Sequence, residues 1–289
     1  MNPTRKKHNK KTVPSIVGVF LLLIFGLGFY GVLVEPYQVE IRHVWLDDSK
    51  LSKILAGKIA VQLSDLHMDE IGRREKKVIN IVEGLKPDFI FLTGDYVSRK
   101  GNYEAALDFL SKLKAKIGVW AVMGDYDYSL PRMSCLFCHK QGTGEPSHRH
   151  EVRFLRNVIE KVNIGDELIW IGGLSPEAKD PSSYQKIFLR RKSKGPTIIL
   201  SHNPLNFELL DGAQEALMLS GNTHGGQIPL PSWLWRLLGY EKCARYSQGL
   251  FEKGRKKMFV SRGLGTSHLP VRILRRPEVV VLHFGSNST

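Results

Sequence analysis

The longest apolar stretch of the chain lies near its N-terminus. Residues 16–34 form an uninterrupted apolar run with interspersed glycines, close to the roughly 20 residues that a helix needs to span a bilayer. The run is longer than the apolar core of a typical signal peptide, and no small-x-small cleavage site follows it. Glu35 and Pro36 end it. The pattern therefore predicts an uncleaved transmembrane anchor at 16–34 and disfavours the alternative, a buried core helix.

Beyond the anchor, short apolar runs alternate with segments of helical spacing. The first predicted strands lie at 37–46, 58–63, 88–92 and 117–123. The helices predicted between them lie at 73–84 and 103–113. Strands and helices in this order are typical of a mainly parallel sheet with crossover helices, so the predicted fold class is α/β. The remaining pattern predicts a helix at 151–161 and strands at 167–171, 197–200, 216–219, 258–261, 271–274 and 279–284.

One segment interrupts the alternation. Residues 129–150 are rich in Cys, His, Gly and Pro and lack apolar periodicity, so we interpret them as an inserted loop. The 289 residues of the chain are ample for a buried core. The predicted organisation is a basic tail at 1–15, the anchor at 16–34, and one domain at 37–285 that carries the insertion.

Charge gives the anchor an orientation. The formal net charge is +14, and five positive residues precede the anchor within the first eleven positions. Acidic residues outnumber basic ones just after it. The positive-inside rule then predicts a single-pass protein of the inner (cytoplasmic) membrane, with residues 1–15 in the cytoplasm and the domain on the outer side. The remaining positive charge favours a phosphorylated substrate or anionic lipid headgroups as partners, while the anchor argues against nucleic acid; a solvated basic surface is the alternative.

Residues that can bind metal follow five of the predicted strands: Asp65 with His67, Asp95, Asp125, His202, and Asn222 with His224. Ligands of open α/β sheets bind at the carboxyl ends of the strands, where residues distant in sequence converge. Asp, His and Asn suit a pair of divalent metals, which can clamp a phosphate and activate a water. A single Asp after a glycine is usually a turn residue, but the repetition predicts a metal site with Asp95 as the bridge.

The segments LSDLHMD, FLTGDYV, VMGDYDY, LSHNP and SGNTHGGQ resemble the ordered blocks of the calcineurin-like metallophosphoesterases. The resemblance covers about residues 58–285. With the anchor and the later segments RYSQGL and FVSRGLGTSHLPVRILRRPEVVVL, the chain is similar to the membrane-bound subgroup that includes UDP-2,3-diacylglucosamine pyrophosphatases. The resemblance implies a four-layer αββα sandwich with a dinuclear site between the sheets. It also implies a membrane-anchored hydrolase of a phosphate or pyrophosphate ester, with a lipid-linked substrate as the expectation.

The resemblance assigns each strand-end residue a role. The residues that would hold the first metal are Asp65, His67 and His224. Those that would serve the second metal are Asp125, His202 and Asn222, and Asp95 would bridge the two. The catalytic group is expected to comprise Asp95, Asp125, Tyr126 and His202.

Two blocks depart from the family pattern. The third block usually reads Gly-Asn-His followed by an acid, and here Asp125 and Tyr126 take the Asn and His positions. A phenol is a poor proton donor near neutral pH. Asn222 stands where the last block usually has His, so the second site gains oxygen and should favour manganese, magnesium or ferrous iron over zinc. An active hydrolase and a catalytically degenerate scaffold are therefore both open.

The insertion supplies the alternative function. Cys135, Cys138 and His139 have the C-x-x-C-H spacing of c-type haem attachment. The same cysteines, with one or two of His139, His148 and His150, would instead suit a structural zinc, and a local disulfide or free thiols form a third option. The alternative to the hydrolase is a haem- or zinc-bearing binding or redox protein on the same scaffold.

The segment 233–240 reads WLWRLLGY and is unusually aromatic for a loop that follows a metal block. Trp, Tyr and Arg together suit a membrane surface or an acyl-chain groove. A packed core helix is the alternative interpretation of the same pattern.

Overall fold

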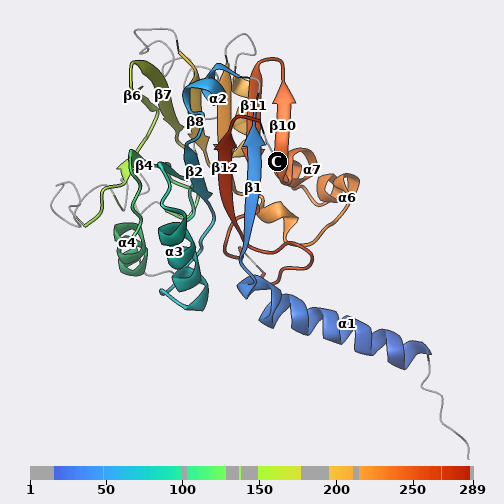
Figure 1. Ribbon diagram of the computed structural model, residues 1–289. Coiled ribbons are helices and arrows are strands. Elements are labelled where there is room, and N and C mark those ends of the chain that lie inside the picture. The colour runs from blue at the N-terminus through green and yellow to red at the C-terminus, as the bar shows by residue number, and fades with distance from the viewer. Residues whose placement is uncertain are drawn as a thin grey trace, which may run out of the picture.

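The computed structural model describes residues 16–47, 49–98, 103–127, 137, 149–176, 195–210, 215–267 and 269–286. The N-terminal apolar run forms helix α1 (Ile16–Leu33), which extends away from the folded domain (Figure 1). By length and composition this helix could cross a membrane, and its side chains are mostly exposed. The prediction of an apolar helix at this position is confirmed.

Within the described residues, two six-stranded sheets form the domain. The first contains, in spatial order, β1 (Glu40–Leu46), β12 (Glu278–Phe284), β2 (Ile59–Leu63), β3 (Phe89–Leu92), β4 (Gly118–Ala121) and β5 (Arg153–Phe154). The second contains β10 (Gly249–Lys253), β11 (Lys256–Val260), β9 (Ala216–Ser220), β8 (Thr197–Ser201), β7 (Glu167–Leu174) and β6 (Val158–Ile164). Both sheets are mixed: β12–β2, β10–β11 and β6–β7 pair antiparallel, and the other pairs are parallel.

Helices and 3-10 turns cover the sheets and connect their strands. The helices are α2 (Lys50–Ile54), α3 (Arg73–Leu85), α4 (Tyr103–Ser111), α6 (Ser232–Leu237) and α7 (Glu241–Tyr246). The 3-10 turns are η1 (Glu35–Tyr37), η2 (Pro204–Leu209) and η3 (His224–Gly226). Figure 1 shows α3 and α4 side by side on one outer face. Phe207 of η2 and Tyr246 of α7 pack against the outer face of the second sheet, so the predicted αββα sandwich is confirmed.

Strand β3 explains why the central strands are apolar without interruption. Phe89 and Phe91 point between the sheets and pack in the core that both sheets share. Ile90 and Leu92 point to the other face and pack against α3 and α4. All four side chains are fully buried, as expected for a parallel strand covered on both faces.

The helix predicted at 151–161 is wrong. The segment forms β5 and most of β6 instead, and β6 pairs antiparallel with β7 through a turn at Gly165. Val158, Ile159, Val162 and Ile164 explain the difference, because β-branched residues lose side-chain freedom in a helix and pack well on a pleated sheet. Helix α2 and strand β10 were not predicted.

The strand predicted at 271–274 is also wrong. This segment is a loop, and its N–H groups donate to different partners rather than to one neighbouring strand. Arg272 N–H donates to Gly31 O of α1, and Ile273 N–H donates to Gln227 O, both at 2.8 Å. Leu274 then turns with a φ of +53°. The segment thus connects the end of α1 to the loop that follows β9.

Candidate metal centre at the carboxyl ends of the strands

Loops that follow strands of both sheets meet at one edge of the sandwich. Asp65 N–H donates to Gly94 O at 2.9 Å and His67 N–H donates to Asp95 O at 3.0 Å, which joins the loops after β2 and β3. Between the sheets, Gln62 Nε2 donates to the carbonyl of Ser220 at 2.9 Å, which joins the ends of β2 and β9. The predicted convergence of the strand-end residues is therefore observed.

The backbone is strained where the ligand-type side chains project. Asp65, His67, Asp95, Asn222 and His224 all have φ between 43° and 73°. Such conformations cost non-glycine residues about 1–3 kcal/mol each and gather at functional sites. The rest of the fold therefore holds these five residues in backbone conformations that are unfavourable for the isolated segments.

Two glycines allow the loops to approach this closely. A Cβ atom on Gly124 would lie 2.1 Å from Asp95 Oδ1. A Cβ atom on Gly221 would lie 1.9 Å from Ser64 Oγ and 2.3 Å from Asp65 Oδ2. Any side chain at either position would therefore displace a carboxylate of the centre.

Two imidazoles and a carboxylate form the first subsite. His67 Nε2 and His224 Nε2 lie 3.1 Å apart, and His224 Nε2 lies 3.5 Å from Asp65 Oδ1. His224 Nδ1 lies 3.3 Å from Gly265 O, so the ring N–H at Nδ1 faces the carbonyl and the Nε2 lone pair faces His67. Burial lowers the pKa of both histidines, which favours the neutral, metal-binding form. These residues fit a divalent cation.

Asp95 lies between this subsite and His202. Its Oδ2 is 3.4 Å from His67 Nε2 and 3.2 Å from His202 Nε2. His202 Nδ1–H donates to Thr93 O at 2.8 Å, while its buried Nε2 has no hydrogen-bond partner among the described residues. An unpartnered buried nitrogen beside a shared carboxylate oxygen is the arrangement that a metal ligand needs.

The centre concentrates negative charge. Burial opposes ionisation of Asp95, but His202 and His67 outweigh it and hold the pKa of Asp95 well below its usual range. Burial by itself lowers the pKa of His202, but the nearby carboxylates, Asp95 first, outweigh it and raise that pKa to about 10. The carboxylates thus attract a positive charge to the place where a cation would bind.

The sequence matches the calcineurin-like phosphoesterase family over residues 60–228, a span that contains every strand-end residue named above. The chain belongs to this family. Its fold and its buried Asp and His cluster agree with a metallophosphoesterase that uses divalent metal ions.

Relatives of similar length come from several bacteria. The uncharacterized metallophosphoesterase YkuE of Bacillus subtilis is 27% identical over 92% of this chain and 93% of its own. The UDP-2,3-diacylglucosamine pyrophosphatase LpxG of Chlamydia muridarum is 27% identical over 86% of this chain and 90% of its own. The phosphodiesterase YaeI of Escherichia coli is 30% identical over 68% of this chain and 70% of its own.

The third block of this metallophosphoesterase contains a structural carboxylate that the sequence did not single out. Asp127 is fully buried and accepts N–H groups from Asp95, Tyr96 and Gly124, each at 2.7 Å. Burial and the Asp95 carboxylate raise the pKa of Asp127 to about 7, while the Gly124 and Tyr96 N–H groups favour its charged form. The sequence does contain a signal for Asp127, because the residue occupies the acid position of the third block.

Tyr126 lies beside the shared carboxylate. Its backbone N–H donates to Asp95 Oδ1 at 2.9 Å. Its ring meets the His67 ring edge-on, with centroids 4.9 Å apart. Tyr126, which is expected to act in catalysis, thus lies beside Asp95 and the His67 ring of the first subsite.

The second subsite differs from the first. Asp125 Oδ2 lies 4.0 Å from His202 Nε2, and the side chain is 52% exposed. Asn222 Nδ2 donates to Asp125 Oδ2 at 3.0 Å, and Asn222 Oδ1 accepts from Lys242 Nζ at 2.9 Å. Lys242 comes from α7, and no pattern in the sequence distinguished it from other basic residues. These residues do not fit a second divalent ion as they stand, because the carboxamide oxygen is already bonded to an ammonium.

The candidate haem or zinc ligands of the insertion lie outside the described residues. This applies to Cys135, Cys138, His139 and His148. His150 is described, and both of its ring nitrogens have partners: Nδ1 accepts from Val152 N–H at 3.2 Å and Nε2 lies 3.1 Å from Phe137 O. His150 therefore does not present a nitrogen to a zinc ion.

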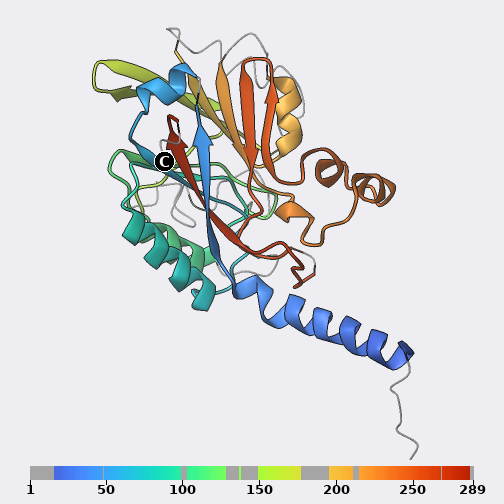
Figure 2. The same ribbon diagram turned by 45° about the vertical axis from the view of Figure 1, so that its right-hand side comes forward.

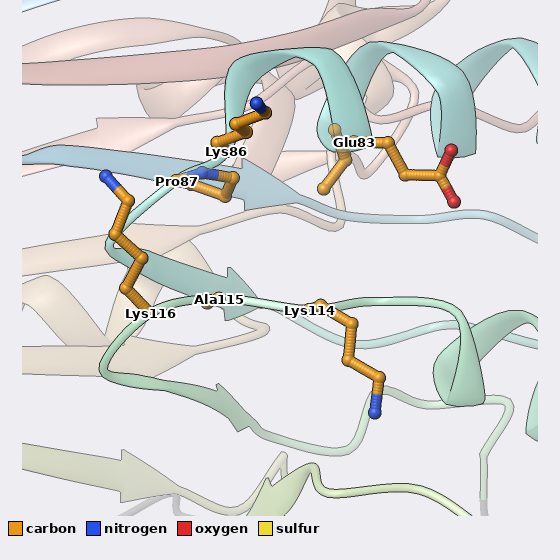
Figure 3. A pocket seen from close by; sticks show the side chains of 7 residues that line it. Glu83, Lys86, Pro87, Lys114, Ala115 and Lys116 are labelled. Atoms are coloured by element: carbon orange, nitrogen blue, oxygen red, sulfur yellow. The ribbon is translucent and has the colours of Figure 1, made fainter.

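A hollow of about 420 Å³ lies at the opposite, amino ends of β3 and β4 (Figure 3). Lys86, Lys114 and Lys116 line it, but the Lys114 side chain points away from the other two. Lys116 pairs with Asp88 at 3.5 Å and Lys114 pairs with Glu151 at 3.4 Å. The lysines do not converge on one point, so the hollow lacks the features of a phosphate site.

Proposed function

We propose that this chain is a membrane-anchored, metal-dependent phosphohydrolase that cleaves a phosphate or pyrophosphate ester of a lipid-linked substrate. One observation carries the catalytic part: the Asp95 carboxylate lies within 3.4 Å of His67 and 3.2 Å of His202 in a buried centre beside Asp65 and His224. A divalent cation bound there would polarise a phosphoryl oxygen and lower the pKa of a water. Manganese, magnesium and ferrous iron suit this mixed oxygen and nitrogen set.

The chain's own residues hold and orient the reacting groups. Asp65, His67 and His224 form the first subsite. The Asp95 Oδ2 atom lies between this subsite and His202. Gly265 O fixes the ring of His224, and Thr93 O fixes that of His202, at 3.3 and 2.8 Å from the respective Nδ1 atoms. With a cation bound, these tautomers would direct both Nε2 lone pairs at the centre.

The attachment of α1 supports the membrane part of the proposal. Gly31 O accepts from Arg272 N–H at 2.8 Å, and the Glu35 carboxylate accepts from the N–H groups of Leu274, at 2.9 Å, and Arg275. The same loop reaches Gln227, three residues after His224, through Ile273 N–H at 2.8 Å. The end of the anchor is thus connected by one short loop to a segment that carries a candidate metal ligand.

An exposed apolar surface lies on the same side of the domain. We call it the α6 surface and define it as Trp233, Leu237, Leu238 and Tyr240. None of the residues of α6 is buried, and Leu237 is 76% and Trp233 63% exposed. The interpretation of 233–240 as a packed core helix is therefore wrong. In both views α6 and α7 project toward the side from which α1 extends (Figure 1; Figure 2).

A membrane accounts for the exposure of this surface better than water does. Leu269 and Leu274, 62% and 71% exposed, lie on the loop that holds α1. Exposed Trp, Tyr and Leu near a transmembrane helix are typical of the bilayer interface. The name of the relative LpxG describes a pyrophosphatase that acts on a diacylated sugar nucleotide. A metal centre held close to the bilayer would suit a substrate of that chemical class.

The test uses the full-length protein in vesicles with manganese. One substrate is a lipid-linked pyrophosphate ester and the other is a water-soluble phosphodiester. We expect manganese-dependent hydrolysis, faster for the lipid-linked ester, that falls at least about 100-fold in Asp95→Ala. Asp69→Ala is the matched control, because Asp69 is an exposed aspartate four residues after Asp65, in the loop that follows β2. Equal rates for wild type and Asp95→Ala with every divalent metal would refute the hydrolase.

A further inference from the structure

Three side chains at the mouth of the centre form a closed polar network. Asn222 Nδ2 donates to Asp125 Oδ2 at 3.0 Å, Lys242 Nζ donates to Asn222 Oδ1 at 2.9 Å, and Lys242 Nζ lies 3.7 Å from Asp125 Oδ2. The backbone N–H of Asn222 also donates to both oxygens of Asp65 at 3.0 Å. These bonds fix the backbone from which the side-chain amide of Asn222 projects. Two members of the network, Asp125 and Asn222, stand where the metallophosphoesterase blocks usually have neutral Asn and His.

The orientation of the amide follows from charge. An ammonium only donates hydrogen bonds and a carboxylate only accepts them. Turning the Asn222 amide over would place its oxygen against Asp125 and its NH₂ group against Lys242, two repulsive contacts. Asn222 Oδ1, the amide atom that can ligate a cation, is therefore held by Lys242.

The network also balances its own charge. Asp125 adds a negative charge where the family pattern has a neutral amide, and Lys242 adds a positive charge from α7 on the other side of Asn222. The Lys242 side chain is 35% exposed, so its ammonium lies at the solvent-facing mouth rather than in the buried first subsite. A divalent ion at Asn222 would be repelled by this ammonium and would have to break its hydrogen bond.

We propose that Lys242 replaces the second metal ion. The chain then holds one divalent cation, in the buried centre of Asp65, His67, Asp95, His202 and His224, and Lys242 supplies the second positive charge that pairs with a phosphate oxygen of the substrate. This inference rests on the proposed function, because it concerns the cation content of the same centre. It assigns a substrate-binding role to a residue outside the sequence blocks.

Metal stoichiometry tests the proposal without relying on activity. The full-length protein in detergent is stripped with a chelator and dialysed against manganese, and bound metal is measured by mass spectrometry beside the electron paramagnetic resonance spectrum. We expect one manganese per wild-type chain with an uncoupled spectrum, and none in His224→Ala. Lys242→Met should bind two ions with a spin-coupled spectrum, and Asn222→His in that background should tighten the second ion at least about tenfold, as a nitrogen ligand is added.

Lys242→Arg is the matched control, because it keeps the charge and should remain at one ion. Two ions of similar affinity in the wild type, or one ion in both Lys242→Met and the double variant, would overturn the proposal. Because Lys242 is partly exposed, circular dichroism should show both Lys242 variants folded. The absence of any bound manganese in the wild type would instead overturn the proposed metal-dependent function, so the two failures are distinguishable.

Discussion

At the residue scale, the centre depends on backbone conformations that few non-glycine residues adopt. It also depends on the Asp127 carboxylate, which holds one of these segments in place. Asp95, with a φ of 58°, carries the shared oxygen of the centre. Its own N–H and that of Tyr96 both donate to Asp127. Asp127 thus supports the loop after β3, although its side chain lies behind Asp95 rather than in the centre.

Replacing Asp127 with Asn should weaken the fold. An amide offers one oxygen to three N–H groups and places its own NH₂ beside them. At pH 8, above the pKa of about 7, the wild-type carboxylate is charged. We expect the free energy of unfolding to fall by about 2–3 kcal/mol, measured by urea denaturation in detergent. Asp69→Asn, at an exposed position, should change it by less than about 0.5 kcal/mol, and equal stability of the two variants would contradict this role.

The sequence located the ligand residues because each follows a strand directly. Asp65, Asp95 and His202 needed only the rule that strand ends converge. Lys242 could not be found in this way, because its approach to Asn222 depends on the path of α7 across the centre, and a single lysine in a basic chain carries no signal of its own.

At the element scale, the strands with continuous apolar runs were predicted well and the irregular segments were not. Strands β2, β3, β8 and β9 are buried on both faces, so the run itself is the signal. The segment at 151–161 mixes apolar and charged residues at spacings that fit both periods, and its pairing with β7 decided the outcome. The loop at 271–274 has the composition of a strand, but its partners are α1 and Gln227.

That loop depends on a buried arginine whose guanidinium, among the described residues, donates to backbone carbonyls. Arg272 is fully buried, and its guanidinium donates to the carbonyls of Gly265 at 2.9 Å, Arg275 at 2.8 Å and Arg262 at 2.8 Å. Burial lowers the pKa of Arg272 to about 9. Because Gly265 O also faces His224 Nδ1, Arg272 positions a candidate metal ligand through the loop.

Arg272→Met should therefore affect both stability and metal binding. We expect the free energy of unfolding to fall by about 3 kcal/mol, because the carbonyls that it bonds lose a charged donor. Manganese affinity should fall about tenfold, as for other residues that orient a ligand. Urea denaturation and calorimetric titration measure the two effects. Arg276→Met, at an exposed position of the same loop, should leave both unchanged, and an unaltered manganese affinity in Arg272→Met would exclude the positioning role.

At the scale of the whole molecule, charge on the two sides of α1 predicts which side of the membrane the domain occupies. The tail at 1–15 carries five positive residues within its first eleven positions and no acid. We expect protease added outside spheroplasts to digest the domain in the wild type. Changing the five basic residues to Gln should remove the bias and protect a substantial fraction of the chains. Complete protection of the wild-type domain would place it in the cytoplasm.

The α6 surface should matter only when the substrate is in the bilayer. Each buried Leu or Trp contributes about 1.5–3 kcal/mol, so charges at Trp233 and Leu237 should lift this edge of the domain off the membrane. We expect Trp233→Glu with Leu237→Glu to lower hydrolysis of a lipid-linked ester in vesicles at least about tenfold and to leave a water-soluble phosphodiester unaffected. Trp45→Glu is the control, because Trp45 is 41% exposed near the end of β1 farthest from α1 (Figure 1). An equal loss on both substrates would mean that the α6 surface supports the centre itself and not its position on the membrane.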